Sequence, residues 1–229
     1  MQGLDERLAA VAAFVPLGAR LADIGTDHAK LPLALAAAGK IAHAIAVDVN
    51  EGPFEAARRS VQTAGLAQAV EVRLGDGLAA LAPGEVDSVA VAGMGGSLIS
   101  RILTDGSAVL RAVETLVLQP QSDEAELRAW IYDNGWHIAE ESLVRAGGRL
   151  YEILLARRGK KEKPEPILLE IGPCLWQKKP PLLKEHIEQL LFRVRRAREG
   201  MEKSARAKEG AAYRALGEKA AALEEKLIW

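Results

Sequence analysis

Short apolar runs alternate with amphipathic segments over the first 158 residues of the chain. The apolar runs have the length of buried β-strands, and the segments between them repeat apolar side chains at the three- and four-residue spacing of a helix. Strands are predicted at residues 19–24, 42–47, 70–74, 86–92 and 115–118, and helices at 4–14, 30–38, 53–64, 98–103 and 123–134. This alternation predicts a parallel sheet with helices on both faces.

The pattern changes after residue 135. Residues 136–144 and 150–156 are two further strand-like runs, and the pair Gly147-Gly148 lies between them as in a β-hairpin. The predicted fold is therefore α/β and Rossmann-like, a doubly wound, mostly parallel seven-stranded sheet with an antiparallel C-terminal hairpin. This arrangement is typical of class I methyltransferases, whereas a classical nucleotide-binding dehydrogenase continues the parallel pattern.

A different pattern occupies the C-terminal third. Residues 159–166 are charged and contain two prolines, and from residue 182 onward apolar side chains recur at helical spacing in two segments, with Gly200 and Gly210 as breakpoints. We expect three parts: a catalytic domain at 1–158, a linker at 159–177, and a small antiparallel two-helix coiled coil at 178–229.

Composition narrows the class of protein. Hydrophobic residues make up 49% of the chain and charged residues 27%, which is ordinary for a globular protein. The single cysteine, Cys174, excludes an internal disulfide framework. No apolar run reaches the ~18 residues of a membrane span, and Asp5 and Glu6 stand where a signal peptide has basic residues. We expect a soluble, cytoplasmic protein.

The charge is unevenly distributed although the net charge is only −1. Residues 1–158 contain 14 Lys/Arg and 20 Asp/Glu, and residues 159–229 contain 16 and 11. A basic tail on an acidic body suggests a polyanionic partner. On charge alone, a solvated helical surface is the favoured explanation of the tail, because surface charge is weak evidence for a site.

Polar residues gather where four predicted strands end. In an open α/β sheet, ligands lie outside these carboxyl ends. The candidate cofactor-binding residues are Asp23, Ile24, Gly25, Thr26, Asp27 and His28 after the first strand, Asp48 and Val49 after the second, Gly75, Asp76 and Gly77 after the third, and Ala92, Gly93 and Met94 after the fourth. Singly, such an aspartate is often a helix cap or a turn residue. Four strand ends that agree on one location favour a bound ligand.

The nature of that ligand follows from the first strand end. Gly25 has no second and third glycine after it, so the dinucleotide fingerprint G-x-G-x-x-G is absent. The carboxylates of Asp23 and Asp27 suit a ligand with positive charge, and Asp48, about 20 residues on, suits ribose hydroxyls. S-adenosylmethionine, with its ammonium and sulfonium groups, is such a ligand. The four scattered histidines and one cysteine have no metal-ligand spacing, so no metal is expected.

Several motifs resemble one family. Ala22-Asp-Ile-Gly-Thr-Asp-His-Ala-Lys-Leu-Pro32, Arg73-Leu-Gly-Asp-Gly-Leu78, Val91-Ala-Gly-Met-Gly-Gly96 and Leu118-Gln-Pro120, followed by Tyr151-Glu-Ile-Leu-Leu155 and Gly172-Pro173, are similar to the bacterial tRNA (adenine-N1)-methyltransferases that act at position 22. The resemblance implies a Rossmann-like catalytic domain with a C-terminal coiled coil, a whole tRNA as substrate, and 1-methyladenosine as product. The family often has an aromatic residue at Lys30 and an acidic residue other than aspartate at Asp48.

The implied chemistry needs few groups. Adenine N1 has a free lone pair at neutral pH, and its methylation leaves a cation until N6 loses a proton. A carboxylate beside the base can stabilise that charge or accept the proton. Asp27 is the first candidate catalytic residue and His28 the second. The [DNS]-P-P-[YFW] signature of exocyclic-amine methyltransferases is absent after the fourth strand, which counts against N6 methylation.

Two other functions stay open from the sequence alone. The chain could methylate another RNA site or a small molecule, or it could be an RNA-binding module without chemistry. We expect tRNA to be bound partly by the basic C-terminal helices, and the protein to be a monomer.

Overall fold

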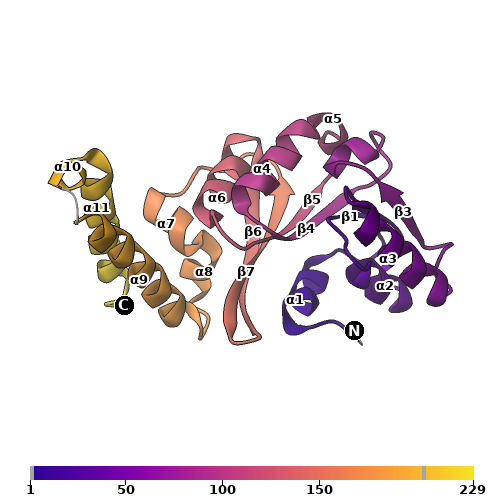
Figure 1. Cartoon of the computed structure of the whole chain (residues 1–229), viewed down its shortest axis with the longest axis horizontal. Helices are drawn as coiled ribbons and strands as arrows, with labels where there is room; N and C mark the ends of the chain where they lie inside the picture. The colour runs from indigo at the N-terminus through magenta and orange to yellow at the C-terminus, as the bar shows by residue number, and fades with distance from the viewer. Residues whose placement is uncertain (1–2, 203–204) are drawn as a thin grey trace. The chain divides into compact units, whose positions relative to one another are not determined.

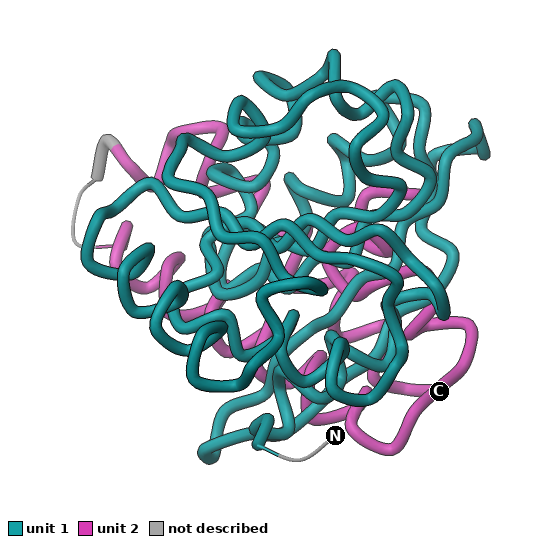
Figure 2. The backbone as a smooth tube through the Cα atoms, turned by 90° about the vertical axis from the view of Figure 1, so that its right-hand side faces the viewer, with its two compact units in different colours: residues 1–163 teal, residues 164–229 magenta. Residues whose placement is uncertain are grey.

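The computed structural model describes residues 3–202 and 205–229. The chain divides into two compact units, residues 1–163 and 164–229, which Figure 2 distinguishes by colour. The expected division had residues 159–177 as a linker, so the second unit begins within that stretch.

The first unit is built on one seven-stranded sheet (Figure 1). Its strands are β1 (Ala19–Ile24), β2 (Ile41–Asp48), β3 (Val70–Leu74), β4 (Ser88–Met94), β5 (Thr115–Pro120), β6 (Trp136–Ala146) and β7 (Arg149–Arg158). The order across the sheet is β3-β2-β1-β4-β5-β7-β6, in which β1 to β5 pair in parallel and β7 pairs antiparallel with both β5 and β6. The predicted fold class is confirmed.

Helices cover both faces of this sheet. They are α1 (Glu6–Phe14), α2 (Lys30–Ala37), α3 (Glu51–Thr63), α4 (Gly96–Asp105), α5 (Ser107–Leu110) and α6 (Glu124–Asp133), with a 3-10 turn η1 (Gly77–Ala80). Val11, Leu35 and Val61, from α1, α2 and α3, belong to one hydrophobic cluster against the strands. In Figure 1, α4, α5 and α6 lie on the opposite side of the sheet from α1 and α2. The central strands are buried on both faces, which explains their continuous apolar runs.

One buried ion group joins α6 to the hairpin. Arg128 is fully buried, and its guanidinium donates to Glu141 (2.7 Å) and to Glu152. Both carboxylates are nearly inaccessible as well. Since an isolated buried charge is costly, the three side chains depend on one another.

The second unit consists of helices α7 (Pro166–Ile171), α8 (Pro173–Lys178), α9 (Leu183–Met201), α10 (Ala205–Lys208) and α11 (Ala211–Lys226). Contacts between Arg195 and Glu224 (2.8 Å) and between Glu202 and Tyr213 (2.9 Å) show that α9 and α11 run antiparallel. The two long helices and their antiparallel direction were predicted. Knobs-into-holes packing, which defines a coiled coil, stays a prediction.

The helices α7 and α8 occupy the predicted linker. Pro166 and Pro173 stand in the first turn of a helix, where proline is well tolerated, so these prolines begin helices. Leu169, Ile171 and Leu175 are buried, and α7 contacts both α9 and α11. The apolar run that follows the charged stretch therefore contributes to the core of the second unit. No helix in the described parts of the chain is both long and apolar enough to span a bilayer.

Candidate functional site

The site lies where the strand order reverses between β1 and β4. Backbone hydrogen bonds hold the neighbouring strand ends together: the N–H groups of Gly25 and Thr26 donate to the carbonyl of Val47 (2.9 and 3.1 Å), and that of Gly75 donates to the carbonyl of Asp48 (2.9 Å). The ends of β1, β2 and β3 thus form one continuous edge. This is the position at which open α/β sheets bind ligands.

A cavity of about 470 Å³ opens at this edge. It is lined by Gly3, Asp5, Arg7, Leu8, Asp23, Gly25, Thr26, Asp27, His28, Lys30, Leu31, Ala92, Gly93 and Gln121. Of the residues expected from sequence, those after β1 and β4 line it except Ile24 and Met94. The residues after β2 and β3, namely Asp48, Val49, Gly75, Asp76 and Gly77, lie beside it on the same edge and outside its lining.

Asp23 is the buried carboxylate of the cavity. It is 5% exposed, and its Oδ2 accepts a hydrogen bond from the hydroxyl of Thr26 (2.6 Å). Burial raises the pKa of Asp23 to about 6; the Thr26 hydrogen bond opposes this rise and the nearby Asp48 carboxylate adds to it. A carboxylate in this state favours a positively charged ligand, which would replace the lost solvation.

The backbone conformation at Gly25 favours a glycine. Its φ is +73°, in the left-handed region, and a Cβ there would lie 2.1 Å from Cε of Met94. The side chain of Met94, from the end of β4, therefore packs against the open face of Gly25. This contact adds to the parallel pairing of β1 and β4, which holds the two strand ends together.

The segment between β1 and α2 has an unusual backbone. Asp27 and Ala29 have φ values of +52° and +54°, which non-glycine residues rarely adopt. The N–H of Asp27 donates to Oδ2 of Asp48 (3.3 Å), while the side chain of Asp27 is 68% exposed and its Oδ1 lies 3.6 Å from Nε2 of His28. The N-cap of α2 is Ala29, and no side chain caps it. The alternative in which Asp27 serves as a helix cap is therefore wrong.

Asp48 connects this segment to β2. The residue is buried, and its Oδ1 accepts from the backbone N–H of Asn50 (3.0 Å) while its Oδ2 accepts from Asp27. Val49 beside it is 58% exposed. Asp48 thus holds the backbone of Asp27 in place, in addition to the ligand role expected for it.

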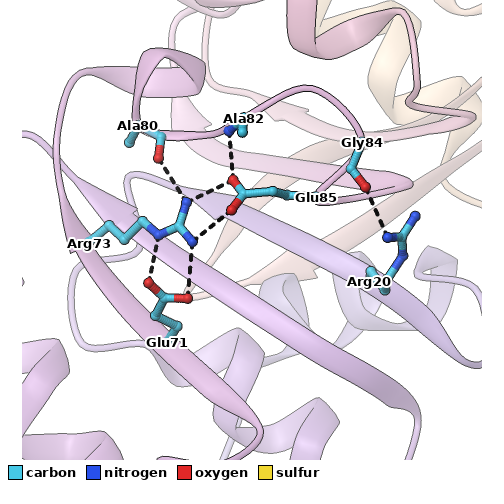
Figure 3. Close-up of polar contacts among 7 residues, drawn as sticks. All are labelled: Arg20, Glu71, Arg73, Ala80, Ala82, Gly84 and Glu85. Carbon is cyan, nitrogen blue, oxygen red and sulfur yellow. Dashed lines mark hydrogen bonds and ion pairs between the residues drawn. The ribbon is translucent and has the colours of Figure 1, made fainter.

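The turn after β3 is braced by an ion network (Figure 3). Arg73 donates to both oxygens of Glu71 (2.7 and 3.0 Å), to both oxygens of Glu85 (2.8 and 3.0 Å) and to the carbonyl of Ala80 (3.0 Å). Hydrogen bonds from Arg73 and from the backbone N–H of Ala82 lower the pKa of Glu85 to about 2. These contacts close the loop of residues 74–85, which carries the exposed Asp76.

Comparison with known proteins identifies the family. A family model described as a methyltransferase domain matches residues 4–154. The chain is 40% identical to the tRNA (adenine(22)-N(1))-methyltransferase of Bacillus subtilis over 159 residues, which are 69% of this chain and 67% of that protein. The chain belongs to the tRNA (adenine(22)-N1)-methyltransferase family.

Solved structures agree with this family over the whole chain. The crystal structure of the B. subtilis m1A22 tRNA methyltransferase TrmK has a TM-score of 0.91 at 32% identity and covers 99% of this chain and all of that one. Streptococcus pneumoniae Sp1610, described as a putative tRNA (m1A22) methyltransferase and solved in complex with S-adenosyl-L-methionine, has a TM-score of 0.86 at 37% identity over 96% of this chain and 98% of that one. The resemblance inferred from the motifs is confirmed.

Two residues that line the cavity, Arg7 and Gln121, are not among the site residues predicted from the sequence. Arg7 lines it from α1 and donates through Nη1 to the side-chain oxygen of the buried Gln119 (2.7 Å). Gln121 lines it from the segment after β5, where its N–H donates to the carbonyl of Met94 (2.9 Å). Arg7 precedes the first strand, so strand-end reasoning could not find it. The predicted strand at 115–118 and the motif at Leu118–Pro120 indicate the end of β5, and neither of them points to Gln121.

Proposed function

We propose that this protein transfers a methyl group from S-adenosylmethionine to N1 of an adenine in tRNA, at position 22, and produces 1-methyladenosine. The observation that carries the proposal is a buried aspartate at the reversal point of a methyltransferase sheet, in a chain that aligns end to end with a solved structure named for this activity. A non-catalytic RNA-binding module has no use for a buried, partly desolvated carboxylate beside an open cavity.

The cavity fits S-adenosylmethionine by charge. Asp23 is buried and receives one hydrogen bond from Thr26, so it suits the ammonium of the amino-acid part. Gly93 leaves the β4 side of the cavity without a side chain. We infer that Asp48 accepts hydrogen bonds from the ribose hydroxyls and that Asp76, which is exposed, accepts from the adenine amino group of the cofactor. The cofactor supplies an electrophilic methyl group attached to a sulfonium.

The protein's own contribution to the reaction is orientation and charge. We infer that Asp27 faces the target adenine, because its side chain is exposed at the cavity and caps no helix. The carboxylate would stabilise the positive charge that methylation places on the adenine and accept the proton released from N6. His28, whose imidazole lies 3.6 Å from the Asp27 carboxylate, is the second candidate for this role.

We further infer that the second unit binds part of the tRNA. The exposed surface of α9 carries Phe192, which is 62% exposed, close in sequence to Arg193 and Arg196. An exposed aromatic ring among arginines suits stacking on a base together with phosphate contacts. In this proposal residues 1–158 hold the cofactor, the C-terminal helices hold RNA, and the protein acts as a monomer in the cytoplasm.

The test is direct. Purified protein is incubated with labelled S-adenosylmethionine and an unmodified tRNA transcript that has adenine at position 22, and the digested nucleosides are separated. Label is expected in 1-methyladenosine, and none is expected with a transcript that has guanine at that position. Label in N6-methyladenosine, or equal labelling of both transcripts, would contradict the proposal.

A further inference from the structure

A second cavity of about 490 Å³ borders the first. It lies along one face of α3 and is lined by His28, Ala56, Arg59, Ser60, Thr63 and Ala64. Of these, His28 also lines the cofactor cavity, so the two cavities meet at this side chain. The other five residues, from α3 and its C-cap Ala64, recur at helical spacing, and all of them except Arg59 have small side chains, which leaves a groove between α3 and the turn before α2.

The two cavities differ in charge. The first is lined by the carboxylates of Asp5, Asp23 and Asp27 and also by the cations of Arg7 and Lys30, whereas the groove along α3 has no carboxylate and includes a guanidinium and an imidazole. A ligand that carries an ammonium group suits the first cavity, and an anion suits the groove.

Arg59 supplies the positive charge of the groove. Its side chain is exposed and takes part in no ion pair or hydrogen bond among the described residues. The preceding residue, Arg58, has the opposite situation, because its Nη2 lies 2.8 Å from Oε2 of Glu55. Of the two neighbouring arginines, Arg58 is therefore paired with Glu55, and Arg59 can bind an external anion.

We infer that this groove binds a backbone phosphate of the tRNA substrate, held by Arg59 and by the hydroxyl of Thr63. The inference rests on the proposed function. An enzyme that methylates N1 must take the adenine out of its stack, and the flanking phosphates then follow the base toward the site. The groove shares His28 with the cavity that the base enters, and arginine binds phosphate through paired N–H groups. Its open form suits a polymer backbone.

The experiment compares Arg59→Ala and Arg59→Lys with the matched control Arg58→Ala. The dissociation constant for tRNA is measured by filter binding over a series of salt concentrations, and the affinity for S-adenosylmethionine by calorimetry. Arg59→Ala is expected to weaken tRNA binding roughly five- to tenfold at ~0.1 M salt and to lower the salt slope by about 0.9, the value of one phosphate contact. Arg59→Lys should keep the wild-type salt slope because it keeps the charge, and it should recover only part of the affinity because an ammonium lacks the paired N–H groups.

The expected result for Arg58→Ala is unchanged tRNA binding, and all three variants should bind S-adenosylmethionine as the wild type does. Equal tRNA affinity and salt slope for Arg59→Ala and Arg58→Ala would overturn the proposal, and so would a loss of S-adenosylmethionine affinity in Arg59→Ala. A wild-type protein that binds tRNA without methylating it would contradict the proposed function, and the tRNA affinities of the Arg59 variants would still test the groove. A wild-type protein that does not bind tRNA would overturn both.

Discussion

Replacement of Asp23 by asparagine should separate stability from cofactor binding. The change keeps the size of the side chain and leaves an oxygen that can accept the Thr26 hydroxyl, while it removes the negative charge from a residue that is 5% exposed. The charge is unfavourable in the free protein because burial opposes ionisation. It becomes favourable when a cationic ligand lies beside it.

The size of the effect follows from the pKa of Asp23, which burial raises from 3.8 to about 6. Between these pH values the folded protein binds more protons than the unfolded chain, so the free energy of unfolding falls as pH rises through this window. A pKa shift of one unit corresponds to about 1.4 kcal/mol, so ionisation of Asp23 lowers the free energy of unfolding by a total on the order of 3 kcal/mol. This cost is fully present above about pH 6. Asp23→Asn removes this pH-dependent cost.

The assay is urea unfolding of the free protein between pH 4.5 and 7.5. The free energy of unfolding of Asp23→Asn, relative to wild type, should increase with pH across this range and level off above pH 6. The same variant should bind S-adenosylmethionine at least tenfold more weakly at pH 7.5. Asp105→Asn, which changes an exposed aspartate of α4, is the control and should alter neither quantity. A pH-independent difference between wild type and Asp23→Asn would refute the account of burial, and unchanged cofactor affinity would remove Asp23 from the site.

Three further predictions address other parts of the chain. Asp27→Asn should lower the single-turnover rate of methylation by roughly 10²–10⁴, with cofactor affinity and melting temperature unchanged because Asp27 caps no helix; a normal rate would assign the role elsewhere. Arg128→Ala should reduce the free energy of unfolding by about 3–5 kcal/mol in urea titrations, because it leaves two buried carboxylates; a loss under 1 kcal/mol would contradict this. Deletion of residues 164–229 should preserve cofactor binding in calorimetry and abolish tRNA methylation, and normal methylation would exclude a role in RNA binding.

The elements that can be predicted from the sequence are those that leave a local pattern of apolar and polar residues. Apolar runs located all seven strands, and they are clearest at β1, β4 and β5, because buried parallel strands need apolar side chains on both faces. The sequence predicts a linker where α7 and α8 lie, because a charged, proline-containing stretch precedes them. Proline favours both linkers and first turns of helices, and only the tertiary burial of Leu169 and Leu175 distinguishes the two.

At the site, too, local sequence patterns reveal some residues, while others depend on tertiary contacts. Strand ends could be located from sequence, so the residues around Asp23 and Gly93 were expected at one edge. The contact of Arg7 with Gln119 joins residues 112 positions apart and leaves no local pattern. The positive φ values of Asp27 and Ala29 were equally hidden, since neither residue type signals a left-handed conformation as glycine does.

The turn between β1 and α2 concentrates the unfavourable features of the first unit. Within seven residues it contains a buried carboxylate, two non-glycine residues with positive φ, and a helix start without a side-chain cap. Each of these costs on the order of 1–3 kcal/mol. The buried Asp48 holds the turn through the N–H of Asp27, and the packing of Met94 on Gly25 fixes its other side. The result is that Asp23 lies inward on the strand while Asp27, four residues later, has its side chain in solvent. One short turn can therefore present the carboxylate of Asp23 to the cofactor and that of Asp27 to the substrate. If α2 began without this strain, with Asp27 as its N-cap, the Asp27 carboxylate would cap the helix and would not be available to the substrate.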